Sequence, residues 1–165
     1  MTLKGKKQIE RSVMIDTPVD AVWEVLSDSR LLPQWLPVVD EVTSCSLEGA
    51  GVGASRSCVA NLGGRSGTMV ERCVEYTPKR RIAYLVEDET FGMRKLFDDY
   101  GFSLDLTPTG TRQTRVTLQT HYTPRNPIYA AMNLAVMRRQ FEQVCQGIVD
   151  GLKAFTEATE AASAH

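Results

Sequence analysis

The sequence predicts an α+β fold in which a curved antiparallel sheet of about seven strands packs against one long C-terminal helix. Two patterns carry this prediction. From Asn126 to about Ala162, apolar residues recur at steps of three and four, which is typical of the buried face of an amphipathic helix. Between Val38 and Tyr122, short segments separated by turn residues instead predict hairpin-connected strands. We expect any ligand site to lie between the helix and the sheet.

The first strand and two short helices precede the hairpins. Ile9–Ile15 alternates as a half-buried strand does. Thr17 is a suitable N-cap and Pro18 suits the first helical position, so a helix should follow and end near Asp28. A second short helix or turn is expected at residues 30–35.

The remaining elements follow from alternation, turn residues and helical spacing. The predicted strands are 39–47, 54–62, 68–76, 81–87, 97–106 and 114–122. The helical stripe is formed by Met137, Phe141, Val144, Ile148, Leu152 and Phe155. The glycines of Gly49–Gly53 and Gly63–Gly64 do not open a helix, so they favour hairpin turns over a phosphate-binding loop.

Length, charge and composition restrict the class of protein. The 165 residues predict a single domain spanning 1–165. The net charge of −1 gives no reason to expect nucleic acid binding. No segment approaches the roughly 18 apolar residues of a membrane span, so stable membrane insertion is not expected. Gln8 and Glu10 follow the N-terminal lysines where a signal peptide needs an apolar run, which predicts a cytoplasmic protein.

The sequence predicts neither a metal site nor a cofactor. The chain has two histidines, His121 and His165, and no pair of ligands at metal-binding spacing. By alternation, His121 lies opposite the apolar face of its strand, which argues against a catalytic triad. The four cysteines are far apart in the sequence and are expected to be free thiols in or near the core.

Several local patterns, in this order, resemble the START-related superfamily, which includes polyketide cyclases/dehydrases, lipid-transfer START domains and the birch pollen allergen. The matching segments are Thr17 to Asp28, Leu32 to Pro37, Ser55-Arg56, Pro78 to Tyr84, Thr107 to Arg112 and Gly151 to Lys153. The resemblance covers residues 8–158 and implies a helix-grip fold, in which the sheet wraps the C-terminal helix around an apolar cavity. It leaves the activity open, because this superfamily hosts carriers, enzymes, receptors and co-chaperones.

Aromatic and sulfur side chains are the candidate lining of such a cavity. They are Trp35, Tyr84, Tyr100, Phe102, Tyr122, Met132, Met137 and Phe141. In the predicted strand 68–76, Glu71 and Arg72 lie on opposite faces, so one of them should face the core unless a bulge intervenes. A charge that faces an apolar cavity must be paired or shift its pKa, which makes this residue a candidate ligand anchor or acid/base.

Three functions are compatible with these observations. The leading hypothesis is binding of a hydrophobic small molecule, such as a lipid, a quinone or a polyketide-like ring system. The second is an enzyme of the polyketide cyclase, aromatase or dehydratase type, with Glu71 or Arg72, Tyr84 and Tyr100 as candidate groups. The third is a co-chaperone-like module that binds another protein. The polar residues Arg115 and Gln119 on the outer sheet face argue against this third function.

Overall fold

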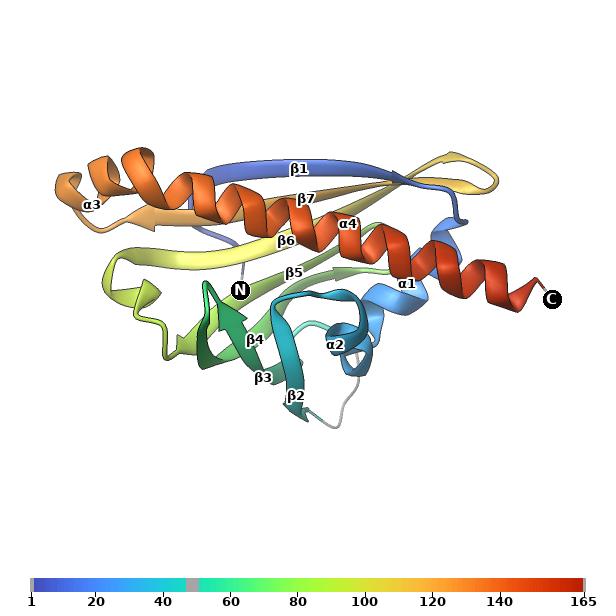
Figure 1. Cartoon of the computed structure of the whole chain (residues 1–165), viewed down its shortest axis with the longest axis horizontal. Helices are drawn as coiled ribbons and strands as arrows, with labels where there is room; N and C mark the ends of the chain where they lie inside the picture. Colours follow the sequence, from blue (N-terminus) through green and yellow to red (C-terminus); the bar gives the residue numbers. More distant parts are fainter. Residues whose placement is uncertain (1, 47–50, 165) are drawn as a thin grey trace.

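The computed structural model describes residues 2–46 and 51–164. In it a seven-stranded sheet curves around one long helix, and two short helices follow the first strand (Figure 1), which confirms the predicted α+β fold. The elements are β1 Lys7–Ile15, α1 Val19–Ser27, η1 Ser29–Leu31, α2 Leu32–Trp35, β2 Val39–Cys45, β3 Ser55–Leu62, β4 Arg65–Thr77, β5 Arg81–Glu89, η2 Met93–Lys95, β6 Phe97–Gly110, β7 Gln113–Pro124, α3 Pro127–Met132, η3 Asn133–Met137 and α4 Arg138–Ser163.

The sheet is antiparallel, with the strand order β1-β7-β6-β5-β4-β3-β2. Every strand from β2 to β6 pairs with the next one along the chain, whereas β1 pairs with β7 across most of the sequence. Register shifts interrupt the β4–β5 and β6–β7 pairs, and such bulges bend a strand and increase its twist. The resulting curvature makes the concave face that receives α4.

The C-terminal helix is continuous over 37 residues, but it is not a regular α-helix throughout. Asn126 caps its start by accepting a hydrogen bond from the backbone N–H of Tyr129. Between α3 and α4, the segment η3 forms a π-helical turn. This wider turn buries Asn133, whose Oδ1 accepts a hydrogen bond of 3.0 Å from the hydroxyl of Tyr122 on β7. The sequence pattern did not predict the π turn.

The buried face of α4 is shifted from the predicted stripe. Its fully buried residues are Cys145, Val149, Leu152 and Thr156. Phe141, Val144 and Ile148 are only partly buried, because they border an internal cavity. Three residues of the predicted stripe, Phe141, Val144 and Ile148, therefore face the cavity, whereas Leu152 belongs to the buried face. The helix α4 packs mainly on β1, and also on α2 and α1.

One local prediction differs from the structure. Pro18 rather than Thr17 occupies the N-cap position of α1, and no side chain caps this helix. Thr17 is fully buried, and its carbonyl oxygen accepts a hydrogen bond from Thr114, which ties the β1–α1 connection to β7. The expected turn at Gly49–Gly53 lies partly outside the described residues. Gly63 and Gly64 form the two-residue turn between β3 and β4, with φ of 60° and 82°, values that a type I′ turn requires.

The predicted thiols are free, and three of the four lie in the core. Cys58, Cys73 and Cys145 are buried, whereas Cys45 on the edge strand β2 is exposed. Among the described residues, no helix is both long and apolar enough to cross a membrane.

Candidate functional site

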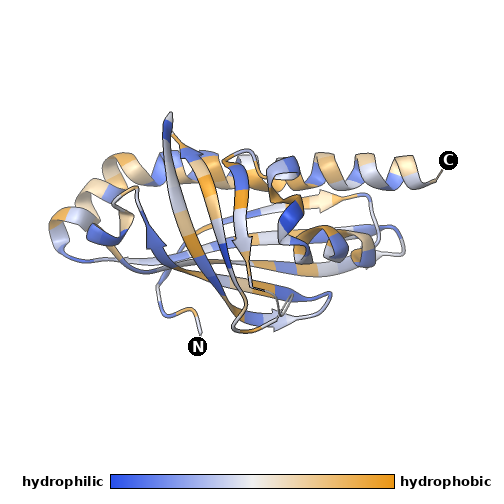
Figure 2. Ribbon diagram, turned by 90° about the horizontal axis from the view of Figure 1, so that it is seen from below, coloured by the Kyte–Doolittle hydropathy of each residue, from blue (hydrophilic) through white to orange (hydrophobic). Residues whose placement is uncertain are grey.

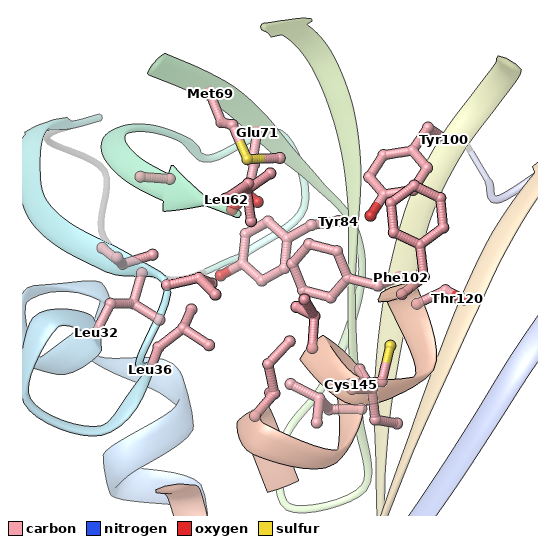
Figure 3. A pocket seen from close by; sticks show the side chains of 18 of the residues that line it. Leu32, Leu36, Leu62, Met69, Glu71, Tyr84, Tyr100, Phe102, Thr120 and Cys145 are labelled. Carbon is pink, nitrogen blue, oxygen red and sulfur yellow. The ribbon is translucent and has the colours of Figure 1, made fainter. Parts of the chain in front are cut away.

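An apolar cavity of about 100 Å³ lies between the concave face of the sheet, α2 and α4 (Figure 3). Its wall combines aliphatic side chains from α2 and β3 with aromatic side chains from β5, β6 and β7. Tyr84 and Phe102, which are register partners on β5 and β6, stack with ring centroids 5.6 Å apart. The cavity therefore presents flat, apolar surfaces of the kind that pack against a ring system.

Seven of the ten candidate residues lie on this cavity. They are Trp35, Glu71, Tyr84, Tyr100, Phe102, Tyr122 and Phe141. The other three are Arg72, Met132 and Met137, which do not line it. Met132 is exposed at the end of α3. Met137, the last residue of the π turn, packs against an aromatic cluster at that end of the molecule.

The structure resolves which charged residue of β4 faces the core. Glu71 points into the cavity with a side chain only 10% exposed. Arg72 points to the outer face, where its Nη2 donates a 2.9 Å hydrogen bond to Oε2 of Glu87 on the neighbouring strand. Arg72 as an inward-facing candidate is therefore wrong, and Glu71 is the residue that bears on the site.

The partner of Glu71 is Arg56, which the sequence analysis did not single out. Arg56 lies directly opposite Glu71 in the β3–β4 register, and its Nε donates a 2.6 Å hydrogen bond to Oε2 of Glu71. Its Nη1 lies 3.3 Å from the hydroxyl of Ser29, and its guanidinium carbon lies 3.9 Å from the centroid of the Tyr84 ring. Alternation could have identified it, because Arg56 shares its strand face with the core residues Cys58 and Ala60.

Arg56 is held in its charged form by the group beside it. Burial alone would lower the pKa of Arg56, but the carboxylate of Glu71 more than offsets that effect and raises the pKa above its ordinary value. Burial raises the pKa of Tyr84, and the adjacent Arg56 opposes that rise. Burial also raises the pKa of Tyr100, so both phenols remain neutral hydrogen-bond donors near neutral pH.

Several polar groups of the cavity have no protein partner in the part of the chain that the structure describes. The indole Nε1 of Trp35 and the hydroxyl of Thr120 are buried without a hydrogen bond. Oε1 of Glu71 and Nη2 of Arg56 make none either, since the pair is joined through Oε2 and Nε. Figure 3 shows the hydroxyl of Tyr100 pointing into the space beside Phe102. Buried polar groups are normally hydrogen-bonded, so this arrangement suits an oxygen-bearing guest.

The far end of the cavity is closed by aromatic rings. Phe141 of α4 lies 5.8 Å from the ring of Tyr122 and 6.4 Å from that of Tyr100. Tyr122 is fully buried and is fixed by its hydrogen bond to Asn133 in the π turn. The π turn thus positions one wall of the cavity.

A second, more polar hollow of about 490 Å³ lies beyond the ion pair. Arg56 and Tyr84 line both spaces, so these two side chains form the partition between them. The other residues around the outer hollow are Ser27, Asp28, Ser29, Arg30, Cys45, Ser46, Ala54 and Ser55.

No metal site is evident in the described residues. Within them, no three His, Cys, Asp or Glu side chains gather closely enough to hold an ion. His121 faces the outer side of the sheet, as alternation predicts, where its Nδ1 lies 3.3 Å from the carbonyl oxygen of Gly5. It is thus remote from the cavity and from any nucleophile there.

Comparisons with known proteins agree with this architecture. Residues 6–157 match the family model described as polyketide cyclase / dehydrase and lipid transport. No curated protein sequence matches the chain.

Solved structures with this fold include proteins of different activities. A START superfamily protein from Mycobacterium smegmatis is 13% identical with a TM-score of 0.74, covering 93% of this chain and 99% of that one. An aromatase/cyclase from a Streptomyces species is 20% identical with a TM-score of 0.70, covering 90% and 92%. Norcoclaurine synthase from Thalictrum flavum is 14% identical with a TM-score of 0.74, covering 96% and 99%. At these identities the likeness shows the fold.

Proposed function

The chain belongs to the polyketide cyclase / dehydrase and lipid transport family, and from this premise we propose that it binds a compact, oxygen-bearing ring compound in the cavity between sheet and helix. The observation that carries the proposal is the buried Arg56–Glu71 pair facing an otherwise apolar space. A binding site for a hydrophobic molecule typically combines apolar walls with a few placed polar groups. Burying two charges costs stability that apolar side chains of the same size would not cost, which supports a role for the pair in binding.

The size of the cavity favours a ring over a long acyl chain. Ligand pockets for drug-sized molecules usually measure about 300–1,000 Å³, whereas the inner cavity measures about 100 Å³. An engineered apolar cavity of about 150 Å³ in another protein holds benzene. A single ring therefore matches the inner space, and it would lie against the stacked rings of Tyr84 and Phe102.

The polar groups favour a carbonyl or hydroxyl substituent on that ring. Arg56 offers donors through Nη2, and Glu71 offers an acceptor through Oε1. A substituent that reaches past Arg56 and Tyr84 would enter the outer hollow, which is lined mainly by polar side chains. The proposed ligand is therefore amphipathic, with a ring inside and a polar end at the partition, as in quinones and polyketide-like ring systems.

Tryptophan fluorescence can test this proposal directly. Trp35 lies on the cavity wall, whereas Trp23 packs against Tyr76, 5.1 Å away between ring centroids. The chain has two tryptophans, so Trp23→Phe leaves Trp35 as the single reporter. We expect catechol and methylhydroquinone, which have a single ring, to change its emission saturably, and palmitate to do so weakly. Tight binding of palmitate alone would instead assign the cavity to lipid chains.

Two arginine variants provide a matched control. Arg56→Met removes the charge at the cavity, and Arg72→Met removes a charge from the outer face of the next strand. We expect the first to weaken binding of the oxygen-bearing rings about tenfold or more, as for the loss of a hydrogen bond to a charged group. The second should leave binding unchanged. Equal affinity in both variants, with both folded, would contradict a role for Arg56 in binding.

A second candidate function, catalysis of ring closure or dehydration, is favoured by the free Oε1 of Glu71. A carboxylate in this position can accept a proton from a carbon next to a carbonyl, while Arg56 stabilises negative charge on the carbonyl oxygen. The two candidates are separable with Glu71→Gln. If the protein is an enzyme, this variant should retain ligand binding and lose turnover of a poly-β-ketone substrate. A carrier would bind the same compound and leave it unchanged in both forms.

A further inference from the structure

An exposed apolar surface covers the α3 end of the C-terminal helix, far from the C-terminus (Figure 1). Of the five large hydrophobic side chains that are exposed in the described residues, four lie within nine consecutive positions. They are Ile128 (75% exposed), Met132 (38%), Leu134 (69%) and Val136 (55%). We call these four residues the apolar tip. Figure 2 shows hydrophobic residues on these turns of the helix.

The apolar tip has an unusual arrangement for a surface helix, which normally turns charged residues outward. Asn133, the polar residue at the centre of this segment, points inward and is 2% exposed. Ala131 and Ala135 are exposed between the larger side chains. The water-facing side of α3 and η3 is therefore apolar, while its polar group is used inside the fold to hold Tyr122. An exposed surface of this kind marks an interaction site.

The apolar tip is flanked by arginines, of which Arg139 alone has no ion pair with the described residues. Residues 125–139 contain Arg125, Arg138 and Arg139 and no acidic residue. Arg125 pairs with Asp98, and Arg138 pairs with Glu142. Arg139 is exposed and makes no ion pair with the described residues. Apolar side chains between arginines are the pattern by which a helix lies in the interface of an anionic bilayer.

We propose that the apolar tip docks the protein onto anionic membrane surfaces, with α3 and η3 lying in the interface. The tip is too small for a stable contact with a second copy of the chain. Its four side chains expose on the order of a few hundred Å², against about 800 Å² per partner in a standard protein interface. Membrane docking needs less area, because the unpaired Arg139 adds attraction to the anionic headgroups. The surface is separate from the cavity, so this proposal stands independently of the function proposed above.

Sedimentation with lipid vesicles, without any added ligand, tests the proposal. We expect the protein to bind vesicles of equimolar phosphatidylcholine and phosphatidylserine, to bind phosphatidylcholine alone more weakly, and to lose the difference at high salt. Ile128→Gln combined with Leu134→Gln should weaken binding about tenfold or more, because both side chains leave water on docking. Arg139→Gln should weaken binding to the anionic vesicles alone.

The matched control is Val52→Gln, which changes a side chain of similar exposure (64%) on the connection between β2 and β3. It should leave vesicle binding unchanged. The docking proposal is overturned if the unmodified protein stays in the supernatant with both vesicle types, or if the double variant and the Val52 variant bind equally. It is also overturned if ultracentrifugation shows a dimer that the double variant abolishes while no vesicles are bound. Ring binding measured through Trp35 should be the same in the unmodified protein and in all three variants.

Discussion

Arg56 and Glu71 face each other across β3 and β4, and water reaches only 5% and 10% of their side chains. Moving two charges out of water is costly, and their attraction offsets that cost only while both are present. Removing one partner should therefore lower the stability of the protein more than removing both.

We expect a strong coupling in a double-mutant cycle of this pair. Arg56→Met or Glu71→Met alone should lower the free energy of unfolding by about 3–5 kcal/mol, because an unpaired charge is left buried. The double variant should be close to the unmodified protein, since the two methionines restore an apolar wall. Urea unfolding measures all four proteins. Additive losses in the double variant would mean that the two charges do not compensate each other.

Phe141 provides a second test at this scale, because it lines the cavity while Phe155, on the same helix, does not. Phe141→Ala enlarges an existing space, so it should cost less than the roughly 3–5 kcal/mol typical of this change in a filled core. It should also increase the affinity for naphthalene. Phe155→Ala should leave naphthalene binding unchanged. A full cost for Phe141→Ala, with no probe bound before or after, would show that this region is solid.

Side-chain direction was predictable where strands alternate regularly and less so where they do not. The face shared by Val116, Leu118, Thr120 and Tyr122 follows from alternation, and these residues do point inward. Glu71 and Arg72 stayed ambiguous, because alternation puts one charge on each face of the strand and does not tell which face is inside. Met132 and Met137 lie at the end of α3 and at the end of a π turn that the helical spacing did not predict.

At the scale of elements, Gly151 decides how closely α4 approaches the connection after α2. A Cβ atom at this position would overlap the carbonyl oxygen of Trp35 and touch Pro37. The other glycine of this helix, Gly147, has open space where its Cβ would be. The two glycines are one turn apart, yet only one of them is required for packing.

We therefore expect opposite effects from the same substitution. Gly151→Ala should destabilise the protein by about 1–3 kcal/mol, because Trp35 and α2 must shift. Gly147→Ala should stabilise it by roughly 0.5–1 kcal/mol, since alanine is the better helix former. Thermal unfolding of both variants measures the difference. Similar midpoints for the two variants would mean that α2 is not in close contact with α4.

Among the elements, the strands and the long helix were predictable because their hydrophobic periods extend over many residues. The cap of α1 was not. Thr17 has the chemistry of an N-cap, but its position between β1 and α1 is used for a contact with Thr114 on β7. A tertiary contact therefore overrode a local preference, which sequence spacing alone cannot show.

For the whole molecule, the buried thiols and phenols make stability sensitive to alkaline pH. Burial raises the pKa of Cys58 from 9.0 to about 12 and that of Cys145 from 9.0 to about 11. Folding therefore favours the neutral thiols, and their contribution to stability is complete below pH 9. It is lost as the pH rises through the folded-state values, because the unfolded chain ionises first. Burial also raises the pKa values of Tyr84 and Tyr100, so these phenols likewise lower the stability as the pH rises above 10.

The free energy of unfolding should accordingly be level from neutral pH to about 9 and then fall. Each buried thiol adds a slope of up to about 1.4 kcal/mol per pH unit. Urea titrations across this range measure the slope, and Cys58→Ala with Cys145→Ala should reduce it. Cys45→Ala is the control, because that side chain is exposed. An unchanged slope in the double variant would assign alkaline unfolding to other groups.

The fold could be predicted from the order of its elements, whereas the shape of the cavity could not. Strand alternation places a residue on one face of the sheet, but the volume left over depends on curvature, bulges and the helix position together. Arg56 illustrates the limit. Arg56 shares a strand face with the core residues Cys58 and Ala60, so its inward direction was predictable. Its pairing with Glu71 depends on the register across the Gly63–Gly64 turn.

The pairing of β1 with β7 also has a consequence for folding during synthesis on the ribosome. Lys7 finds its strand partner at His121, so the first strand made has no neighbour until more than one hundred further residues exist. At a synthesis rate of about 5–20 residues per second, this wait is on the order of ten seconds. The strands from β2 to β6 can pair in the order in which they are made, but β1 can join the sheet only after β7 has been made. The nascent chain therefore carries an unpaired β1 until β7 has been made.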